Sequence, residues 1–546
     1  MIVAVVAVRH LPLNHLIPAR PFPARGISHL SVTKTSGSIG GTALTSCGRG
    51  PNRLTRPGAA VGRIPRPASP MEPPVPDTSA ADLDARLTGR LTAQRDAFNR
   101  APYPSLQHRR ARLTMLEDMI RTHQSAFCAA VDADFGQRPH HETELLEIAP
   151  LIGAIRHARR HLGRWMKPER RASAPEFLQL RNRVVCQPLG VVGIMAPWNY
   201  PLYLCFAPLI DVLAAGNRAM IKPSEQTPRT SAAIAEAIGA AFTSDEVCVV
   251  NGGPEVAAQF AALPFDHLVF TGSTAVARKV MAAAAPNLTP LTLELGGKSP
   301  AIVAQDYPLD KAAKAIAFGK LMNAGQTCIA PDYVLVPRDR MRPLAEAVLA
   351  RAQTHYPAAT GARDFTSIMG DAALQRLHAM LIECRARGAE VLSHDTVLPG
   401  PGLRLAPTLV LDPPHDSRVL QDEIFGPILP LVPYDRLGDA LAFVNARPRP
   451  LALYAFSHDP ATRREILEQT HSGNVTLNGT LLHVAQNDLP FGGIGDSGMG
   501  SYHGRDGFRR FSHARGIAQV RLFDPARLIA PPWGRLAGIV KRMMLR

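Results

Sequence analysis

The chain has 546 residues, of which 46% are hydrophobic and 19% charged, and it carries a net charge of +16. A chain of this length forms two or three domains, and its composition is ordinary for a globular protein. Nine Lys and Arg residues and no Asp or Glu fall in residues 1–70, so the remainder has only a mild positive excess, and we expect no nucleic-acid partner.

Cysteine usage points to a reducing compartment. The seven cysteines, at positions 47, 128, 186, 205, 248, 328 and 384, are odd in number and contain no Cys-x-x-Cys pair. This pattern argues against a disulfide framework and a zinc site. No stretch approaches the roughly 18 apolar residues that cross a membrane. We therefore expect a cytoplasmic protein without a bound metal.

The first 70 residues differ from the rest of the chain. They are rich in Pro, Gly, Ser and Arg and lack the apolar spacing of a helix or strand. We expect a disordered extension or an upstream start codon, with Met71 opening the folded protein. A basic, acid-free segment of this kind also leaves open a transit-type leader.

Periodicity in the next part predicts a parallel sheet. Apolar spacing predicts a helix from Ser105 to Phe135 and another along the stripe from Leu145 to Leu162. From Val191 short apolar strands alternate with helices. We expect strands at 191–195, 219–222, 247–250, 267–270 and 291–294, and helices at 203–215, 229–242, 254–262 and 274–284. Such alternation is typical of βαβ units, whose ligands bind at the carboxyl ends of the strands.

A second alternation follows residue 328. It predicts strands at 334–336, 391–392, 408–410, 429–432 and 451–456, and helices at 340–354 and 371–387. The fold class is therefore α/β, with two parallel-sheet domains. Cys328 falls near the seam between the two sheets, where a substrate pocket is usual.

Three polar residues could together process a carbonyl. Cys328 stands in Gly-Gln-Thr-Cys-Ile-Ala-Pro, Glu294 in Leu-Glu-Leu-Gly-Gly-Lys, and Asn199 in Pro-Trp-Asn-Tyr-Pro. A lone cysteine among small residues is most often a core thiol. In this company, however, it supplies a nucleophile beside a base and an amide donor, the parts of covalent carbonyl chemistry.

The chemistry assigns each residue a role. A thiol that attacks an aldehyde creates an oxyanion, and one well-placed donor stabilises it by roughly 3–4 kcal/mol. Asn199, with the backbone N–H of Cys328, is the candidate donor. The next step loses a hydride, which implies a nicotinamide cofactor, and the thioester then needs water activated by Glu294. Asn199 could instead be a turn residue, and Glu294 a strand-end carboxylate satisfied by backbone amides.

Two other motifs resemble nucleotide-binding loops but lack the surrounding sequence that such loops need. Gly493 to Gly498 matches G-x-G-x-x-G, but Pro490 precedes it and no helical period follows. Gly297-Lys298-Ser299 resembles the end of a phosphate loop, but position 292 is Thr where that motif needs Gly. Neither motif predicts nucleotide binding.

From about Leu106 to Arg521 these motifs resemble the NAD(P)-dependent aldehyde dehydrogenase superfamily, and residues 325–333 resemble its class 3 branch of fatty, aromatic and coniferyl aldehyde dehydrogenases. The resemblance implies Cys328 as nucleophile, Glu294 as general base and Asn199 as oxyanion donor.

The resemblance also implies a set of cofactor-binding residues: Trp198, Lys222, Glu225, Gly272, Ser273, Glu423 and Phe425. Lys222 and Glu225 would hold the adenosine ribose. Gly272 and Ser273 would lie under the pyrophosphate at a helix N-terminus, and Glu423 and Phe425 would position the nicotinamide. A carboxylate at Glu225 would repel a 2′-phosphate, which favours NAD and leaves NADP as the alternative.

The resemblance further implies the domain organisation and assembly. The implied parts are a cofactor domain (72–168 and 191–293), a catalytic domain (294–490) and a bridging, oligomerisation element (169–190 and 491–523), in a homodimer. Residues 524–546 form a basic amphipathic tail. It could lie on a membrane surface, but we favour packing along the dimer.

The function expected is oxidation of an aldehyde to the carboxylate with NAD. Coniferyl aldehyde, another aromatic aldehyde or a medium- to long-chain aliphatic one would be the substrate. Three alternatives stay open. A CoA-acylating enzyme would replace water by a thiol, a Cys-dependent hydrolase would need a histidine base, and a binding protein could occupy an inactive scaffold.

Overall fold

A computed structural model describes residues 80–174, 177, 180–357, 361–393, 402–521, 524–528 and 530–545. The predictions for residues 1–70 lie outside the described residues. All described residues belong to one compact unit, Val75–Arg546, which contains three sheets.

The first sheet has six strands in the order β15-β7-β6-β3-β4-β5. They are β3 (Val191–Met195), β4 (Arg218–Lys222), β5 (Val247–Val249), β6 (His267–Gly272), β7 (Leu291–Leu295) and β15 (Gly498–Met499). All neighbours are parallel except β15, which pairs antiparallel with β7. Every residue of β3 and β4 is buried, as expected for parallel strands covered on both faces.

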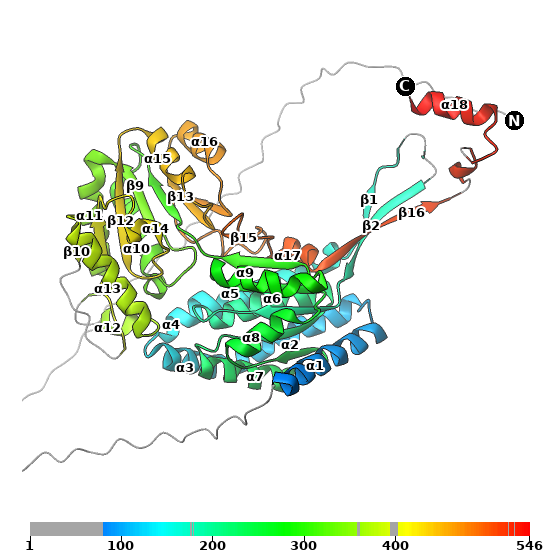
Figure 1. Ribbon diagram of the computed structural model, residues 1–546, viewed down its shortest axis with the longest axis horizontal. Helices are drawn as coiled ribbons and strands as arrows, with labels where there is room; N and C mark the ends of the chain where they lie inside the picture. Colours follow the sequence, from blue (N-terminus) through cyan, green and yellow to red (C-terminus); the bar gives the residue numbers. More distant parts are fainter. Residues whose placement is uncertain are drawn as a thin grey trace, which may run out of the picture. The chain divides into compact units, whose positions relative to one another are not determined.

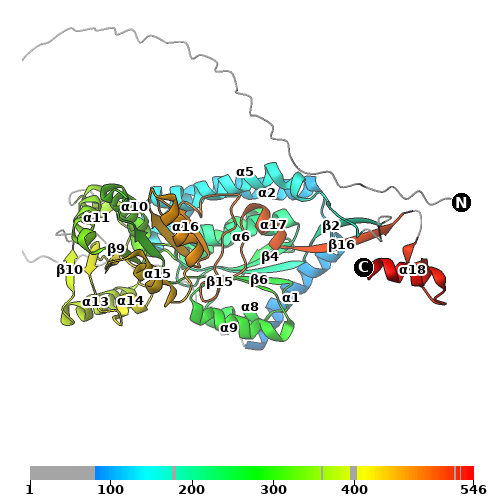
Figure 2. The same cartoon turned by 90° about the horizontal axis from the view of Figure 1, so that it is seen from above.

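Helices cover both faces of this sheet (Figure 2). On one face pack α2 (Leu106–Thr122), α3 (Gln124–Phe135), α5 (Ala149–Trp165), α6 (Pro201–Ala215), α7 (Pro228–Ala241) and α17 (Gly504–Arg510). On the other pack α1 (Ala80–Arg100), α8 (Pro254–Ala262) and α9 (Thr274–Ala284). The sheet is therefore the middle layer of three.

The single helix predicted from Ser105 to Phe135 is wrong, because the chain breaks into α2 and α3 at His123. Ser105 caps α2 by accepting a hydrogen bond from the backbone N–H of His108 at 3.2 Å. The next predicted helix, from Leu145 to Leu162, begins as a π-helical turn, η1 (Glu144–Ile148), and continues as α5, while α4 (His140–Thr143) precedes it. Such turns are frequent at functional sites.

The second sheet has seven strands in the order β10-β11-β12-β9-β8-β13-β14. Figure 1 labels β9, β10, β12 and β13 of this sheet. They are β8 (Pro300–Val303), β9 (Tyr333–Pro337), β10 (Glu390–Ser393), β11 (Thr408–Leu411), β12 (Ile428–Tyr434), β13 (Ala452–Phe456) and β14 (Asn474–Leu477). Only the pair of β10 and β11 is antiparallel.

Helices also lie on both faces of this second sheet. One face is covered by α10 (Leu309–Leu321) and α11 (Met341–His355). The other is covered by α13 (Asp371–Ala386), α14 (Arg418–Gln421), α15 (Leu437–Asn445) and α16 (Pro460–Gln469). A short helix, α12 (Gly361–Asp364), precedes α13.

The third sheet contains β1 (Glu169–Arg171), β2 (Leu180–Pro188) and β16 (Ser512–Val520), all antiparallel. It joins residues before the first sheet to residues after the second. The predicted fold class, two parallel α/β sheets with a bridging element, is confirmed. The predicted domain boundaries stay predictions.

The C-terminal tail forms η6 (Pro525–Leu528) and the helix α18 (Arg535–Met544). Trp533, Leu536 and Ile539 are exposed, whereas Ile529 lies outside the described residues. Across the described ranges, none of the helices is both long and apolar enough to cross a membrane.

Candidate active site

The predicted site residues of the first sheet lie along one edge. Lys222 and Gly272 are the last residues of β4 and β6, Glu294 is next to last in β7, and Asn199 follows β3. Lys222 pairs with Met195, and Glu294 with Thr271. Because the carboxyl ends of parallel strands meet at one edge, the sheet gathers these residues.

Cys328 follows a left-handed bend. The chain leaves α10 through a 3-10 turn, η4 (Met322–Gly325), in which Asn323, Ala324 and Gly325 have φ of 53°, 52° and 76°. A Cβ at Gly325 would lie 2.3 Å from the carbonyl oxygen of Gly426. Left-handed non-glycine residues cost roughly 1–2 kcal/mol each and persist only when surrounding contacts hold them. The bend is therefore imposed by its neighbours.

The structure brings Asn199 against the cysteine loop. Its side-chain amide donates a hydrogen bond to the backbone carbonyl of Gln326 at 3.1 Å, and its side chain is buried. The hydroxyl of Tyr200, the next residue, lies 2.7 Å from the hydroxyl of Thr327. The turn after β3 and the loop that carries Cys328 are thus joined by two hydrogen bonds, one from Asn199 and one from Tyr200.

Glu294 is buried, and neither carboxylate oxygen has a hydrogen-bond partner. Burial raises the pKa of Glu294 well above its usual value, and only the guanidinium of Arg510 opposes that shift. Arg510 is itself engaged elsewhere, because it donates to the hydroxyl of Thr292 at 2.8 Å. The alternative of a carboxylate satisfied by backbone amides is therefore wrong.

The thiol of Cys328 is protonated in this environment. Burial raises its pKa to about 12, with added contributions from the carboxylates of Glu423 and Glu294 and partial opposition from the backbone amides of Cys328 and Ile329. Two carboxyl groups therefore act electrostatically on one thiol. A neutral thiol needs a neighbouring base before it can attack a carbonyl.

The other predicted cofactor residues lie at the same edge. The ammonium of Lys222 donates to Glu225 at 2.8 Å. Ser273 caps the N-terminus of α9, where its hydroxyl accepts from the backbone N–H of Val276 at 3.4 Å. Gly272 precedes that cap, and a Cβ there would meet the ring of Phe270 at 2.6 Å. The Lys222–Glu225 pair and the N-terminus of α9 thus lie at the same edge of the sheet, with β3 between the strands that lead to them.

Trp198, which follows β3, contacts Phe425, which precedes β12. Their rings meet edge-on with centroids 5.5 Å apart, and Phe425 has a left-handed φ of 48°. Burial raises the pKa of Glu423 to about 7, and a Cβ on Gly296 would lie 2.2 Å from its carboxylate. Gly296 therefore leaves space for Glu423.

A buried ion pair that sequence reasoning missed holds the Glu423 loop. Lys298 donates to Asp332 at 2.6 Å and to the carbonyls of Val419 and Asp422 at 2.9 Å each. The backbone N–H of Ile424 donates to the carboxylate of Asp332 at 3.3 Å. No sequence spacing indicates that Asp332 is the partner of Lys298.

The glycine motif after Pro490 also has a structural role. A Cβ on Gly493 would lie 1.9 Å from the carbonyl oxygen of Ser497, so the turn is too tight for a side chain there. It delivers Gly498 to the position opposite Glu294 in the sheet. As the sequence predicted, the motif does not open a helix. It instead leads into β15, which pairs with β7 beside the candidate base.

These residues fit a dinucleotide better than a metal. A pair formed by a buried lysine and an exposed glutamate, a capped helix N-terminus and an aromatic pair suit ribose, phosphate and a flat ring, respectively. Over the residues that the structure describes, no group of three or more His, Cys, Asp or Glu side chains could hold a metal ion.

Comparison with known proteins agrees with the geometry. The model of the Aldehyde dehydrogenase family matches residues 74–517. A probable coniferyl aldehyde dehydrogenase of Pseudomonas aeruginosa is 48% identical over 84% of this chain and 97% of that protein. A dimeric, NADP-preferring aldehyde dehydrogenase of Rattus norvegicus is 37% identical over 79% and 93%.

Among solved structures, the substrate-bound state of AldH from Staphylococcus aureus superposes with a TM-score of 0.78 at 34% identity, covering 84% of this chain and 99% of that one. The family predicted from the motifs is therefore confirmed. The chain belongs to the aldehyde dehydrogenase family.

Proposed function

We propose that this enzyme oxidises an aromatic aldehyde such as coniferyl aldehyde to its carboxylate, with Cys328, Glu294 and Asn199 as the catalytic residues. The observation that carries the proposal is the half-buried Cys328 thiol under the electrostatic influence of the buried, unpartnered Glu294 carboxylate. The 48% identity to a probable coniferyl aldehyde dehydrogenase supports the substrate class. A medium- or long-chain aliphatic aldehyde is the alternative.

The residues divide the reaction between them. The Cys328 thiol passes its proton to a neighbouring carboxylate and its sulfur bonds to the aldehyde carbon, which gives a thiohemiacetal. The amide of Asn199 and the backbone N–H of Cys328 stabilise the oxyanion by roughly 3–4 kcal/mol per good donor. The thiohemiacetal carbon then loses a hydride and becomes the thioester carbon, and NAD, when bound, would supply the hydride acceptor that the side chains lack.

Glu294 then releases the product. It takes a proton from a water molecule whose oxygen bonds to the thioester carbon, and the carbon–sulfur bond breaks to free the carboxylate. A raised pKa suits this role, because a carboxylate made unstable by burial is a stronger base.

Lys222 and Glu225 would bind the adenosine ribose, and Gly272 with Ser273 at the start of α9 would bind the pyrophosphate. Trp198, Glu423 and Phe425 would position the nicotinamide. The Glu225 carboxylate favours NAD over NADP, although one relative is named as NADP-preferring.

The alternatives lack comparable support. A CoA-acylating enzyme has less need of a base such as Glu294. A hydrolase would need a histidine base, and no histidine stands in the sequence motifs that carry Cys328, Glu294 and Asn199. An inactive scaffold would not be expected to keep Cys328, Glu294 and Asn199 together.

We further propose a cytoplasmic homodimer. The third sheet supports the dimer, because β16 is largely exposed in a single chain, and small exposed sheets are commonly covered by a partner. One relative is also named as dimeric. The six described cysteines are free thiols, which fits a reducing compartment. Light scattering after size exclusion tests the dimer.

The decisive experiment is NADH formation by the purified protein with NAD and a series of aromatic and aliphatic aldehydes. Cys328→Ala should abolish the signal. Glu294→Gln should retain a single-turnover burst of NADH and lose steady-state turnover, because hydrolysis of the thioester then limits the overall rate. Absence of NADH with every aldehyde, with and without CoA, would overturn the proposal.

A further inference from the structure

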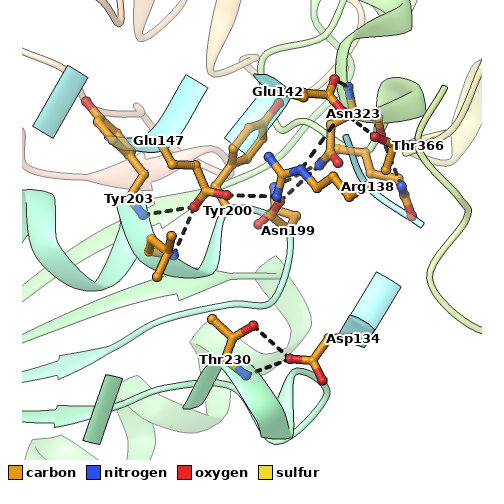
Figure 3. Close-up of polar contacts among 12 residues, drawn as sticks. Asp134, Arg138, Glu142, Glu147, Asn199, Tyr200, Tyr203, Thr230, Asn323 and Thr366 are labelled. Atoms are coloured by element: carbon orange, nitrogen blue, oxygen red, sulfur yellow. Dashed lines mark hydrogen bonds and ion pairs between the residues drawn. The ribbon is translucent and has the colours of Figure 1, made fainter. Parts of the chain in front are cut away.

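Three buried charged side chains lie in the segment between α3 and α5, and the proposed mechanism uses none of them (Figure 3). Arg138 and Glu147 are fully buried, and their side chains are 2.8 Å apart. Glu142 lies 3.9 Å from Arg138, with 9% of its side chain exposed. Charges this deep are unfavourable unless they are paired and hydrogen-bonded. The contacts of these three side chains therefore show which segments of the backbone they stabilise.

On one side, the cluster holds the turn that carries Asn199. Arg138 donates to the backbone carbonyl of Asn199 at 3.3 Å. Glu147 accepts from the backbone N–H groups of Leu202 and Tyr203 at 2.9 and 3.0 Å. These are among the free amides at the start of α6, where a carboxylate is favoured. Arg138 and Glu147 thus fix both ends of a five-residue turn.

On the other side, the same cluster holds the bend before Cys328. Glu142 accepts from the backbone N–H of Asn323 at 2.6 Å and also from the hydroxyl of Thr366. The side-chain amide of Asn323 donates to the carbonyls of Asn199 and Gln326 at 3.0 and 3.1 Å. Asn323 is the first of the three left-handed residues, so Glu142 stabilises the start of the strained bend.

We infer that Arg138, with Glu142 and Glu147, is a positioning group that keeps the Asn199 turn and the Cys328 loop in register. None of the three side chains is placed to touch the substrate. They act through Asn199, whose amide must point at the oxygen that becomes the oxyanion, and the inference therefore rests on the proposed function. A donor displaced by about 1 Å can cost about 100-fold in rate.

The rival interpretation is a purely structural ion pair, which would contribute to stability alone. The two are separated by a double-mutant cycle, because residues that act as a unit give non-additive losses. Arg138→Met by itself would leave Glu147 buried without a counter-charge. The main variant is therefore Arg138→Met/Glu147→Gln, which removes both charges and keeps a polar acceptor for the α6 amides.

Two further variants complete the design. Arg138→Lys keeps a positive charge but lacks the guanidinium, whose Nη1 contacts both Glu147 and the carbonyl of Asn199 while its Nε faces Glu142. It serves if the main variant does not fold. Arg112→Met is the matched control. Arg112 is another buried arginine of the same domain, paired with Glu246 at 2.6 Å, and it has no bond to the site.

The measurements are kcat and KM for an aromatic aldehyde, the Kd of NADH by fluorescence, and Tm. Arg138→Met/Glu147→Gln should lower kcat about 10- to 100-fold with the Kd of NADH within roughly twofold of the parent. In an Asn199→Ala background the same change should cost less than about threefold. Arg138→Lys should fold, and its kcat should be about three- to tenfold lower than that of the parent. Arg112→Met should lower Tm and leave kcat unchanged.

Equal losses in the two backgrounds would overturn the positioning role, as would an unchanged kcat in folded Arg138→Met/Glu147→Gln or in Arg138→Lys. If Asn199→Ala itself keeps full activity, the oxyanion role fails and the positioning role fails with it. If Asn199→Ala is damaging and the Arg138 variants are harmless, only the positioning role fails.

Discussion

Gly498 and Glu294 stand directly opposite each other in the antiparallel pair of β15 and β7. Gly498 has a φ of 150°, and a Cβ there would lie 2.3 Å from the carbonyl oxygen of Leu293. The backbone that carries the candidate base is therefore closed on one side by a residue that must lack a side chain. Gly498 lies in β15, which is the last strand of this sheet in the order of the sequence.

Gly498→Ala tests this relationship. The added methyl group would push β15 away from β7 and shift Glu294, so we expect a loss of about 1–3 kcal/mol in stability and a fall of at least roughly tenfold in kcat. Thermal unfolding and NADH formation measure the two effects. The control is Gly239→Ala within α7, where a Cβ would meet nothing within 4 Å and helix propensity improves. Equal behaviour of the two variants would contradict the prediction.

The pH dependence of thiol alkylation reports the environment of Cys328. Because its pKa is raised to about 12, the thiolate fraction, and with it the rate of reaction with iodoacetamide, should rise about tenfold per pH unit between pH 7 and 9. Cys328→Ser gives the background from the other cysteines. A plateau below pH 9 would mean a thiolate that is already formed in the free enzyme.

Glu423→Gln should change that profile in a pH-dependent way. The carboxylate of Glu423 contributes to the raised pKa of Cys328, and its own pKa is about 7. At pH 9 the variant should react about two- to fivefold faster than the parent, because a negative charge has gone. At pH 6, where Glu423 is mostly protonated, the two proteins should react alike. A pH-independent difference would argue for a packing change instead.

Glu225→Gln should relax the choice of cofactor. The Glu225 carboxylate, 2.8 Å from the Lys222 ammonium, would repel a 2′-phosphate, and its removal leaves Lys222 free to attract one. We expect kcat/KM for NADP to rise roughly tenfold relative to NAD. Steady-state kinetics with both cofactors measure the ratio, and an unchanged ratio would show that Glu225 does not face the ribose.

Asp211, buried within α6, should make stability depend on pH. Burial raises its pKa to about 8, whereas the ordinary value is 3.8, and it accepts from the backbone N–H of His503 at 3.0 Å. The folded state therefore binds the proton more tightly than the unfolded state. Its contribution is complete below about pH 4 and is lost as the pH rises towards 8.

Asp211→Asn removes this titration while keeping an acceptor. The Tm of the variant relative to the parent should therefore increase by about 2–4 °C between pH 5 and pH 8. Thermal unfolding in a set of matched buffers measures the difference. A constant difference across this range would mean that Asp211 stays ionised in the fold.

Local patterns predicted the strands well, and contacts distant in sequence remained hidden. The predicted strand at 191–195 and helices at 254–262 and 274–284 agree with β3, α8 and α9 to the residue, because each carries its own apolar period. The break at His123 lies within a continuous apolar stripe, so periodicity could not indicate it.

In the candidate site too, residues in local motifs could be predicted, whereas contacts between distant segments could not. Cys328, Glu294 and Asn199 stand in recognisable motifs, whereas Arg138 lies between helices in a segment without a chemical pattern, and its partners Asn199 and Glu147 are set by packing. Gly498 ends the glycine motif after Pro490, which leads into the strand β15. Its position opposite Glu294 depends on a pairing across about 200 residues, which one sequence does not reveal.

The late arrival of β15 has a consequence for biosynthesis. Until residues 498–499 are made, β7 is the open edge of its sheet, and an unpaired edge is a template for association with other chains. A nascent or truncated chain that ends before Gly498 would therefore expose the backbone of Glu294 and be prone to aggregate. The base becomes enclosed only when synthesis is nearly complete, so an incomplete chain is inactive rather than partly active.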